Sequence, residues 1–393
     1  MQPALQISTS TSYFCQVNNM DRWAKQPQRV IPLTEDFGLY QNPERVLKCV
    51  LHLLYDAKMY REYPTLRYQG KVCFGALYLL DNMCWEIGRH RRWQLLLDNM
   101  PPAEQEKLAK LRSFQTGSYD SSTACMLNES VFINRKDGLS DQTYKRKSAE
   151  LRQLIEQAIT EATGQPYALT QEARAAIYSA IGEQFDNVLE HVPHAESAQL
   201  CCFYDRTSQE LTIMIFNFGP TFAEKLKSSN LPPEVAGPVK EMVTNYTTRH
   251  WFIPTKAGRT LSEEDALTLL ALQEGISSRL EFDPTRGFGL LDYIDHCFTF
   301  SSHCRISIVS GTTAINIDNK YPIGRRYVFG RERRVLALNP ENDLLRKPDP
   351  NYVRSLSVRF PGVIIETTIP LAISTLPPCL PSPSTSTSLT ISS

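Results

Sequence analysis

Three polar residues at four-residue spacing mark the stretch of this chain that is best suited to chemistry. Glu183, Asn187 and His191 fall on one line of an expected helix. A carboxamide oxygen can ligate Mg²⁺, and a carboxylate one turn away can orient or deprotonate an attacking water. Solvent-exposed helix faces also carry polar residues at this spacing, and His191 also suits packing at a helix end. The line alone therefore leaves a binding site and an ordinary polar face open.

Two glycine-containing segments follow this helix in the sequence. Asn217-Phe218-Gly219 ends a strand-like stretch, and Thr285-Arg286-Gly287-Phe288-Gly289-Leu290 opens an apolar helix. Glycines at a helix start let backbone N–H groups approach a phosphate, and the helix dipole favours the negative charge there. The second segment therefore predicts a site for a phosphate-bearing ligand.

Secondary structure around these residues is expected from apolar spacing and turn residues. The polar line belongs to a helix over 170–192, whose apolar face is spaced at three and four residues. Strands over 198–204 and 210–216 are joined by a short polar turn, which predicts a hairpin directly after that helix. Further strands are expected over 305–309 and, after the turn Pro361-Gly362, over 363–370.

The order of helix, hairpin, lid and glycine segment resembles the GHKL family of ATP-binding proteins. The closest likeness is to the anti-sigma-factor serine kinases and to histidine-kinase-like ATPase domains. The family's N-box, E-x-x-x-N, is matched within GEQFDNVLEHV from Gly182 to Val192, and its second glycine box is matched at 285–290. The segment 274–279 resembles the lid of related bacterial proteins. Over residues 169–371 the resemblance implies the Bergerat fold, a two-layer α+β sandwich.

The resemblance also implies roles for individual residues. Glu183 corresponds to the catalytic residue, as general base or as the carboxylate that orients water, and Asn187 to the ligand of Mg²⁺. Asn217 and Gly219 correspond to residues at the adenine. The residues implied to hold the phosphates are Thr285, Arg286, Gly287, Phe288, Gly289 and Leu290, with Arg286 adding positive charge near the γ-phosphate. The implied cofactors are ATP and Mg²⁺.

Three positions depart from the family pattern. Asn217 stands where the first glycine box has an aspartate, Thr221 stands where it has its second glycine, and Thr285 replaces the first glycine of the second box. An asparagine oxygen can still accept a hydrogen bond, but it carries no charge, and Pro220 stiffens the turn. We expect a reduced nucleotide affinity or a relaxed base preference.

The function implied is an ATP-binding regulatory switch in which Mg·ATP closes a lid over 221–284 and a protein partner is engaged. ATP hydrolysis or phosphoryl transfer to a partner's serine or threonine stays open, so an enzyme assignment as ATPase or anti-sigma-type serine kinase is undecided. No histidine phosphoacceptor helix and no Walker A sequence is present. The alternative is a non-catalytic protein-interaction module on a degenerate GHKL scaffold.

Composition and short sequence patterns limit the partners, the location and the metal sites that we expect. The 393 residues carry 42 Lys+Arg and 42 Asp+Glu, so net charge gives no reason to expect a nucleic-acid partner. No apolar run approaches the roughly 20 residues of a membrane span, and the start lacks the pattern of a secretory signal, so we expect a cytoplasmic protein. The resemblance implies a bacterial signalling protein. A homodimer is left open. His296, Cys297, His303 and Cys304 suggest zinc, but their spacing in strand-like sequence argues against it.

The chain is expected to divide into five parts. Residues 1–40 are expected to form a flexible lead-in, 41–116 a small α/β interaction module, which has some likeness to a STAS domain, and 117–141 a connector. Within 41–116, a strand over 71–75 is expected to run into an apolar helix from Ala76 to Arg92. Residues 142–371 are expected to form the ATP-binding domain, starting with a helix over 142–163, and 372–393 a disordered Ser/Thr/Pro tail.

Overall fold

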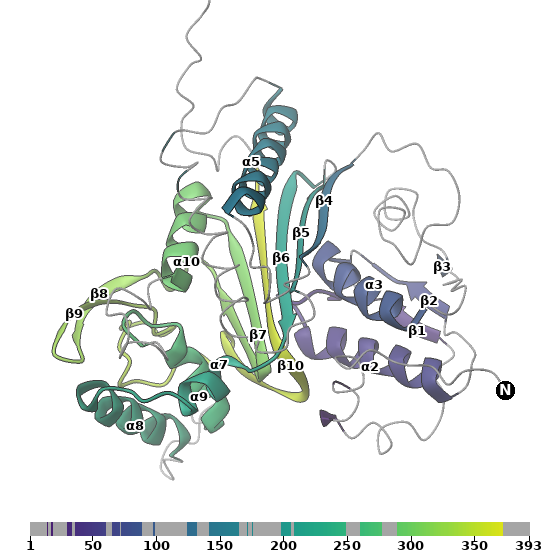
Figure 1. Cartoon of the computed structure of the whole chain (residues 1–393). Coiled ribbons are helices and arrows are strands. Elements are labelled where there is room, and N and C mark those ends of the chain that lie inside the picture. The colour runs from purple at the N-terminus through teal and green to yellow at the C-terminus, as the bar shows by residue number, and fades with distance from the viewer. Residues whose placement is uncertain are drawn as a thin grey trace, which may run out of the picture.

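A five-stranded antiparallel sheet lies at the centre of the part of the chain that the computed structural model describes (Figure 1). Its strand order is β4-β5-β6-β10-β7, and every neighbouring pair is antiparallel. The strands are β4 (Ala124–Val131), β5 (Ala198–Asp205), β6 (Glu210–Phe218), β7 (Arg305–Ile317) and β10 (Val353–Pro370). The structure describes residues 14, 17–18, 30–33, 36–59, 65–70, 72–88, 97–98, 124–131, 141–164, 171, 175, 198–205, 208–248, 260–276 and 289–371.

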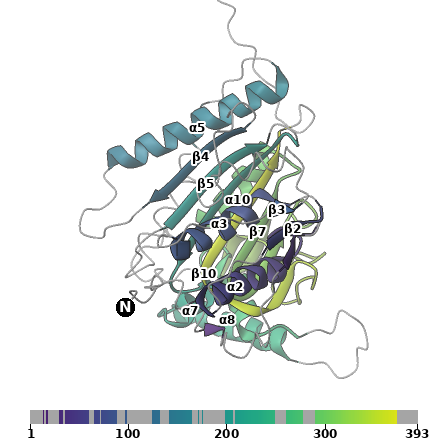
Figure 2. The same cartoon turned by 90° about the vertical axis from the view of Figure 1, so that its right-hand side faces the viewer.

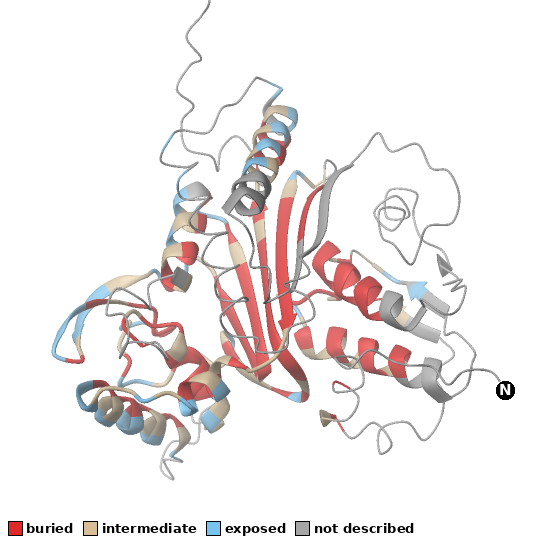
Figure 3. Cartoon of the chain, in the orientation of Figure 1, coloured by how far each residue is buried: buried red, intermediate tan, exposed pale blue. Residues whose placement is uncertain are grey.

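The central strands are apolar on both faces. In β6, Met214 and Phe216 belong to the hydrophobic cluster on one face of the sheet, and Ile213 and Ile215 belong to the cluster on the other face. Successive side chains of a strand point to opposite faces, so this pattern requires that both faces are covered. Figure 3 shows the buried residues running along the middle of the sheet and along the inner sides of the helices.

The N-terminal part of the chain covers one face of the sheet (Figures 1 and 2). Its elements are α2 (Pro43–Met59), α3 (Phe74–Gly88) and a small parallel sheet of β1 (Val30–Leu33), β2 (Thr65–Tyr68) and β3 (Leu97–Asp98). The ring of Phe74 stacks on that of Phe203 in β5, with 3.7 Å between centroids. This N-terminal layer and the sheet therefore share one hydrophobic core.

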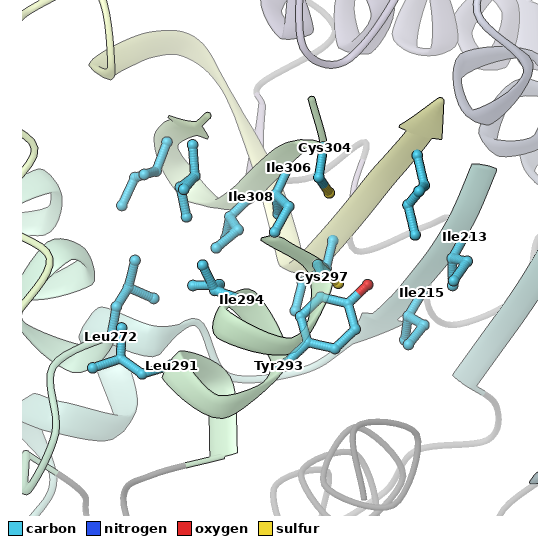
Figure 4. Close-up of a cluster of buried hydrophobic side chains, with 14 of the residues drawn as sticks. Ile213, Ile215, Leu272, Leu291, Tyr293, Ile294, Cys297, Cys304, Ile306 and Ile308 are labelled. Atoms are coloured by element: carbon cyan, nitrogen blue, oxygen red, sulfur yellow. The ribbon is translucent and has the colours of Figure 1, made fainter. Parts of the chain in front are cut away.

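The other face of the sheet packs against helices from later in the chain. They are α5 (Asp141–Thr163), α9 (Glu263–Ala271) and α10 (Gly289–Phe300). Figure 4 shows side chains of β6 and α10 facing one another across this cluster, among them Ile213, Ile215 and Tyr293. A third cluster joins α9 to α7 (Phe222–Lys227), α8 (Pro233–Thr247) and the hairpin of β8 (Gly324–Val328) and β9 (Arg331–Val335).

The fold is thus a mixed α/β fold of the α+β class. Helices α5, α9 and α10 cover one face of the sheet and the N-terminal layer covers the other, so the sheet has a layer on each side where the expectation was a sandwich of two layers. None of the described helices is long and apolar enough to cross a membrane.

Several expected elements are confirmed. The helix over 142–163 is α5, and the hairpin of strands 198–204 and 210–216 is β5 and β6. The strands over 305–309 and 363–370 are parts of the longer β7 and β10, and the expected turn Pro361-Gly362 lies inside β10 at a register irregularity. The expected lid contains α7, α8 and α9 within its described residues.

Other expectations are wrong. Residues 72–73 do not form a strand but lead into α3, because the Cys73 carbonyl already accepts the Leu77 N–H at 3.3 Å. The connector 117–141 contains β4, and the lead-in contains the fully buried side chains of Phe14, Phe37 and Leu39. Two expectations stay predictions: the tail from 372 and the helix over 170–192 lie outside the described residues, except for Gln171 and Ala175, which are helical and exposed.

Candidate functional site

The expected nucleotide site is only partly within the described residues. The structure describes Asn217, Gly219 and Thr221 at the end of β6, and Gly289 and Leu290 at the start of α10. The other expected site residues lie outside it: Glu183, Asn187, His191, Thr285, Arg286, Gly287 and Phe288.

Asn217 lies near the carboxyl end of β6 and is buried. It pairs in register with Ala198 of β5 and Val363 of β10. Strand alternation places Asn217 on the same face of the sheet as Ile213 and Ile215, which is the face covered by α10. The residue expected at the adenine and the helix expected at the phosphates therefore belong to one layer interface.

The chain turns sharply out of the sheet directly after Asn217. The Gly219 N–H donates to the Pro361 carbonyl at 3.1 Å, and Gly219 has a φ of 148°. At Gly362, opposite this turn, an added Cβ would lie 2.0 Å from the Asn217 carbonyl oxygen. Only a glycine at 362 lets the backbones of β6 and β10 approach this closely.

Thr221, at the position where the resemblance predicts a glycine, has a defined structural role. It is the fully buried N-cap of α7, where its Oγ1 accepts the Glu224 N–H at 3.2 Å and its own N–H donates to Glu224 Oε2 at 2.8 Å. This reciprocal capping box stabilises the first turn of α7. The Phe222 N–H donates to Ser310 Oγ of β7 at 2.9 Å, which fixes the helix start to the sheet.

The first turn of α10 is anchored by both packing and charge. Leu291 is buried and Leu290 is partly buried against the cluster beneath α10. Asp292 Oδ1 lies 2.6 Å from Arg334 Nη2 of β9, and Arg334 Nε donates to Glu274 Oε2 at 2.8 Å. Burial lowers the pKa of Arg334, but hydrogen bonds to Glu274 and Asp292 outweigh it and raise the pKa overall.

Ion pairs tie the lid helices to the sheet. Arg359 of β10 contacts Glu264 of α9 at 2.7 Å and Glu224 of α7 at 2.6 Å. The next residue of α9, Asp265, is fully buried and accepts hydrogen bonds from Thr313 Oγ1 at 2.8 Å and from Ser355. Helices α7 and α9 of the expected lid are therefore docked on β7 and β10.

Two cysteines in and after α10 are packed in the core. Cys297 and Cys304 are buried and unoxidised, and Cys297 belongs to α10 rather than to a strand as its sequence suggested. The hydrogen bond with Cys297 and burial raise the pKa of Cys304, which disfavours the thiolate that a metal would need. Among the described residues, no group of three or more His, Cys, Asp or Glu could hold a metal ion.

Two charged residues of interest were not identified from the sequence. Arg334 belongs to a hairpin that carried no motif, and its partners are some 60 and 42 positions away. Glu366 is the carboxylate in the apolar strand segment Val363–Pro370, and it is fully buried. A single Glu in so apolar a strand was a usable signal for a buried acid.

Comparisons with known proteins give no match: no family model fits the chain, and no curated protein and no solved structure is significantly similar to it.

Proposed function

We propose that this protein is an ATP-binding regulatory switch with a Bergerat-type nucleotide site and a cytoplasmic location. Mg·ATP would bind between the end of β6, the start of α10 and the expected helix over 170–192. Asn187 would hold Mg²⁺, and Glu183 would orient or deprotonate water. Binding would change how the lid helices are docked and so change the surface offered to a regulatory protein partner.

The observation that carries this proposal is the placement of Asn217. Its side chain lies on the face of the sheet against which α10 packs, although 72 positions separate Asn217 from Gly289 in the sequence. A polar residue at a strand end, on the sheet face covered by a helix that starts with glycine, is an arrangement that can bind a nucleotide. The docked state of α7 and α9 on β7 and β10 supplies an element whose position binding could alter.

The second candidate is a non-catalytic interaction protein on the same scaffold. Thr221 favours it, because a capping residue fully buried under α7 occupies the position of a glycine that would otherwise leave room near the base. In that case the sheet and helices would be retained for their shape, without nucleotide turnover.

A calorimetric titration of the full chain with ATP, with and without Mg²⁺, tests the proposal. We expect Mg-dependent binding to the wild type that is lost in Asn187→Ala. Glu183→Gln should bind Mg·ATP but lose any turnover, and turnover that depends on Glu183 would exclude the non-catalytic alternative. The proposal is wrong if the wild type shows no binding and Asn187→Ala behaves identically.

A further inference from the structure

An arginine of the β8–β9 hairpin joins the two sides of the expected phosphate-binding segment. Glu274 follows α9 and precedes that segment in the sequence, and Asp292 lies just after it, in the first turn of α10. Arg334 of β9 contacts Glu274 Oε2 through Nε at 2.8 Å and Asp292 Oδ1 through Nη2 at 2.6 Å. One guanidinium group therefore holds the end of the lid and the start of α10 together.

Several hydrogen bonds fix the residues around Glu274 to strand β9. The backbone N–H of Arg334 also donates to Glu274 Oε2 at 3.1 Å, and Arg333 Nη1 donates to the Glu274 carbonyl at 3.2 Å. Gln273 accepts the Leu336 N–H at 2.9 Å. Gly275, with φ of +73°, leaves room for the buried Arg333, since an added Cβ would lie 1.1 Å from Arg333 Nη1. Strand β9 is thus fixed to the residues that end the lid, and the Arg334 side chain extends the connection to α10.

The charge at the start of α10 affects whether phosphates can bind there. A helix N-terminus attracts anions, but the Asp292 carboxylate already lies in this first turn and repels a polyphosphate. Asp295, one turn further along α10, is 3.8 Å from Arg334 Nη1. Arg334 is the cation paired with both, and its guanidinium stays charged at any physiological pH. It therefore offsets the negative charge closest to the expected phosphates.

We propose that Arg334 is a positioning residue for triphosphate binding. It masks the Asp292 carboxylate and holds the first turn of α10 against the end of the lid, so that phosphates can approach the N–H groups that begin at Gly289. This inference rests on the proposed function, and it concerns the phosphates of the ligand and not its base.

Arg325 provides a matched control for the test. It stands directly opposite Arg334 in the β8–β9 register, is also an arginine, and is 71% exposed with Glu332 as its partner at 3.6 Å. Arg334→Ala should weaken the binding of Mg·ATP about tenfold, by exposing an uncompensated carboxylate, and leave the affinity for adenosine unchanged. Arg325→Ala should leave both affinities unchanged.

A second variant separates charge masking from a loss of structure. In the double variant Arg334→Ala with Asp292→Asn, the carboxylate in the first turn of α10 is neutral, so the affinity for Mg·ATP should recover most of the loss seen in Arg334→Ala. A merely structural role for Arg334 would leave the double variant as weak as the single one. The deficit of Arg334→Ala should also shrink at high salt, because the repulsion is screened.

The outcomes distinguish this inference from the proposed function. A wild type that does not bind Mg·ATP overturns both. A wild type that binds, with Arg334→Ala binding equally well, overturns the role of Arg334 alone. An equal loss of ATP and adenosine affinity, or no recovery in the double variant, also overturns it, because then Arg334 supports the fold and does not act on the phosphates.

Discussion

The buried carboxyl group of Glu366 predicts that the protein loses stability as the pH rises from weakly acidic to weakly alkaline. Glu366 lies in β10, between Met214 of β6 and Ser307 of β7 in register, on the face covered by the N-terminal layer. It is 2% exposed, and its Oε2 has no hydrogen-bond partner in the described structure. Gly75 of α3 lies so close that an added Cβ there would be 1.9 Å from Oε2. A charge at this position is poorly solvated.

The magnitude follows from the pKa of the group. Burial raises the pKa of Glu366 from 4.5 to about 7, against a smaller lowering by the positive charge of Arg305. The folded chain therefore holds the proton more tightly than the unfolded chain. This contribution to stability is fully present below pH 4.5 and is lost as the pH rises through about 7. The total loss is about 3 kcal/mol, at about 1.4 kcal/mol for each pKa unit.

Urea unfolding of the full chain at a series of pH values measures this effect. The wild type should lose about 3 kcal/mol of unfolding free energy from pH about 4 to about 8 relative to Glu366→Gln, whose amide does not titrate. Glu332→Gln, which removes a carboxylate that is 63% exposed, should keep the slope of the wild type. Parallel curves for the wild type and Glu366→Gln would refute the reasoning, because then the carboxyl group is solvated or paired when folded.

Three further perturbations test the packing. A chain that begins at Asp141 should aggregate or bind hydrophobic dyes, since it lacks β4 and the helices that cover one sheet face, whereas a soluble chain with native circular dichroism would contradict the shared core. Gly362→Ala should lower the free energy of unfolding in urea by more than about 2 kcal/mol, because its Cβ would meet the backbone of β6. Gly237→Ala, in open space inside α8, should raise it by up to about 1 kcal/mol. Equal effects of the two substitutions would refute this reasoning. Arg359→Ala should lower the free energy of unfolding by about 1–3 kcal/mol, because two carboxylates of α7 and α9 lose their ion-pair partner. Lys227→Ala, at an exposed ion pair, should lower it by less than about 1 kcal/mol. A loss at Arg359 no larger than that at Lys227 would show that this residue does not hold α7 and α9 on the sheet.

The elements that could be predicted from the sequence are those that depend on near neighbours. The apolar periodicity of α5 and the turn between β5 and β6 are encoded within a few residues of each element. The buried pieces of the first 40 residues are different. Phe14 and Phe37 are single anchors in short segments, and each contacts a core built from residues far along the chain. Such a contact leaves no periodic pattern of apolar residues in the sequence. The sequence therefore predicted a flexible lead-in, which is wrong.

The candidate site shows the same division. The face on which Asn217 lies follows from strand alternation in β6 and could be predicted. The connection of Glu274, Arg334 and Asp292 could not, because it depends on the β8–β9 hairpin folding back over the end of α9. Thr221 lies between these cases. A Thr with Glu224 three residues later is a readable capping box, so the structural role of Thr221 could be predicted from the sequence.

The environment of Glu366 depends both on the local strand pattern and on tertiary packing. Its place on the same strand face as Ile364 follows from alternation, but alternation does not say whether that face meets water. If residues 41–116 formed a module standing apart from the sheet, Glu366 would be a solvated carboxylate with an ordinary pKa. Its pKa is raised because the N-terminal layer buries it, with Gly75 of α3 against the carboxyl group. The pH dependence of unfolding therefore also reports on the N-terminal layer: a slope that disappears in Glu366→Gln requires that α3 covers the sheet in solution.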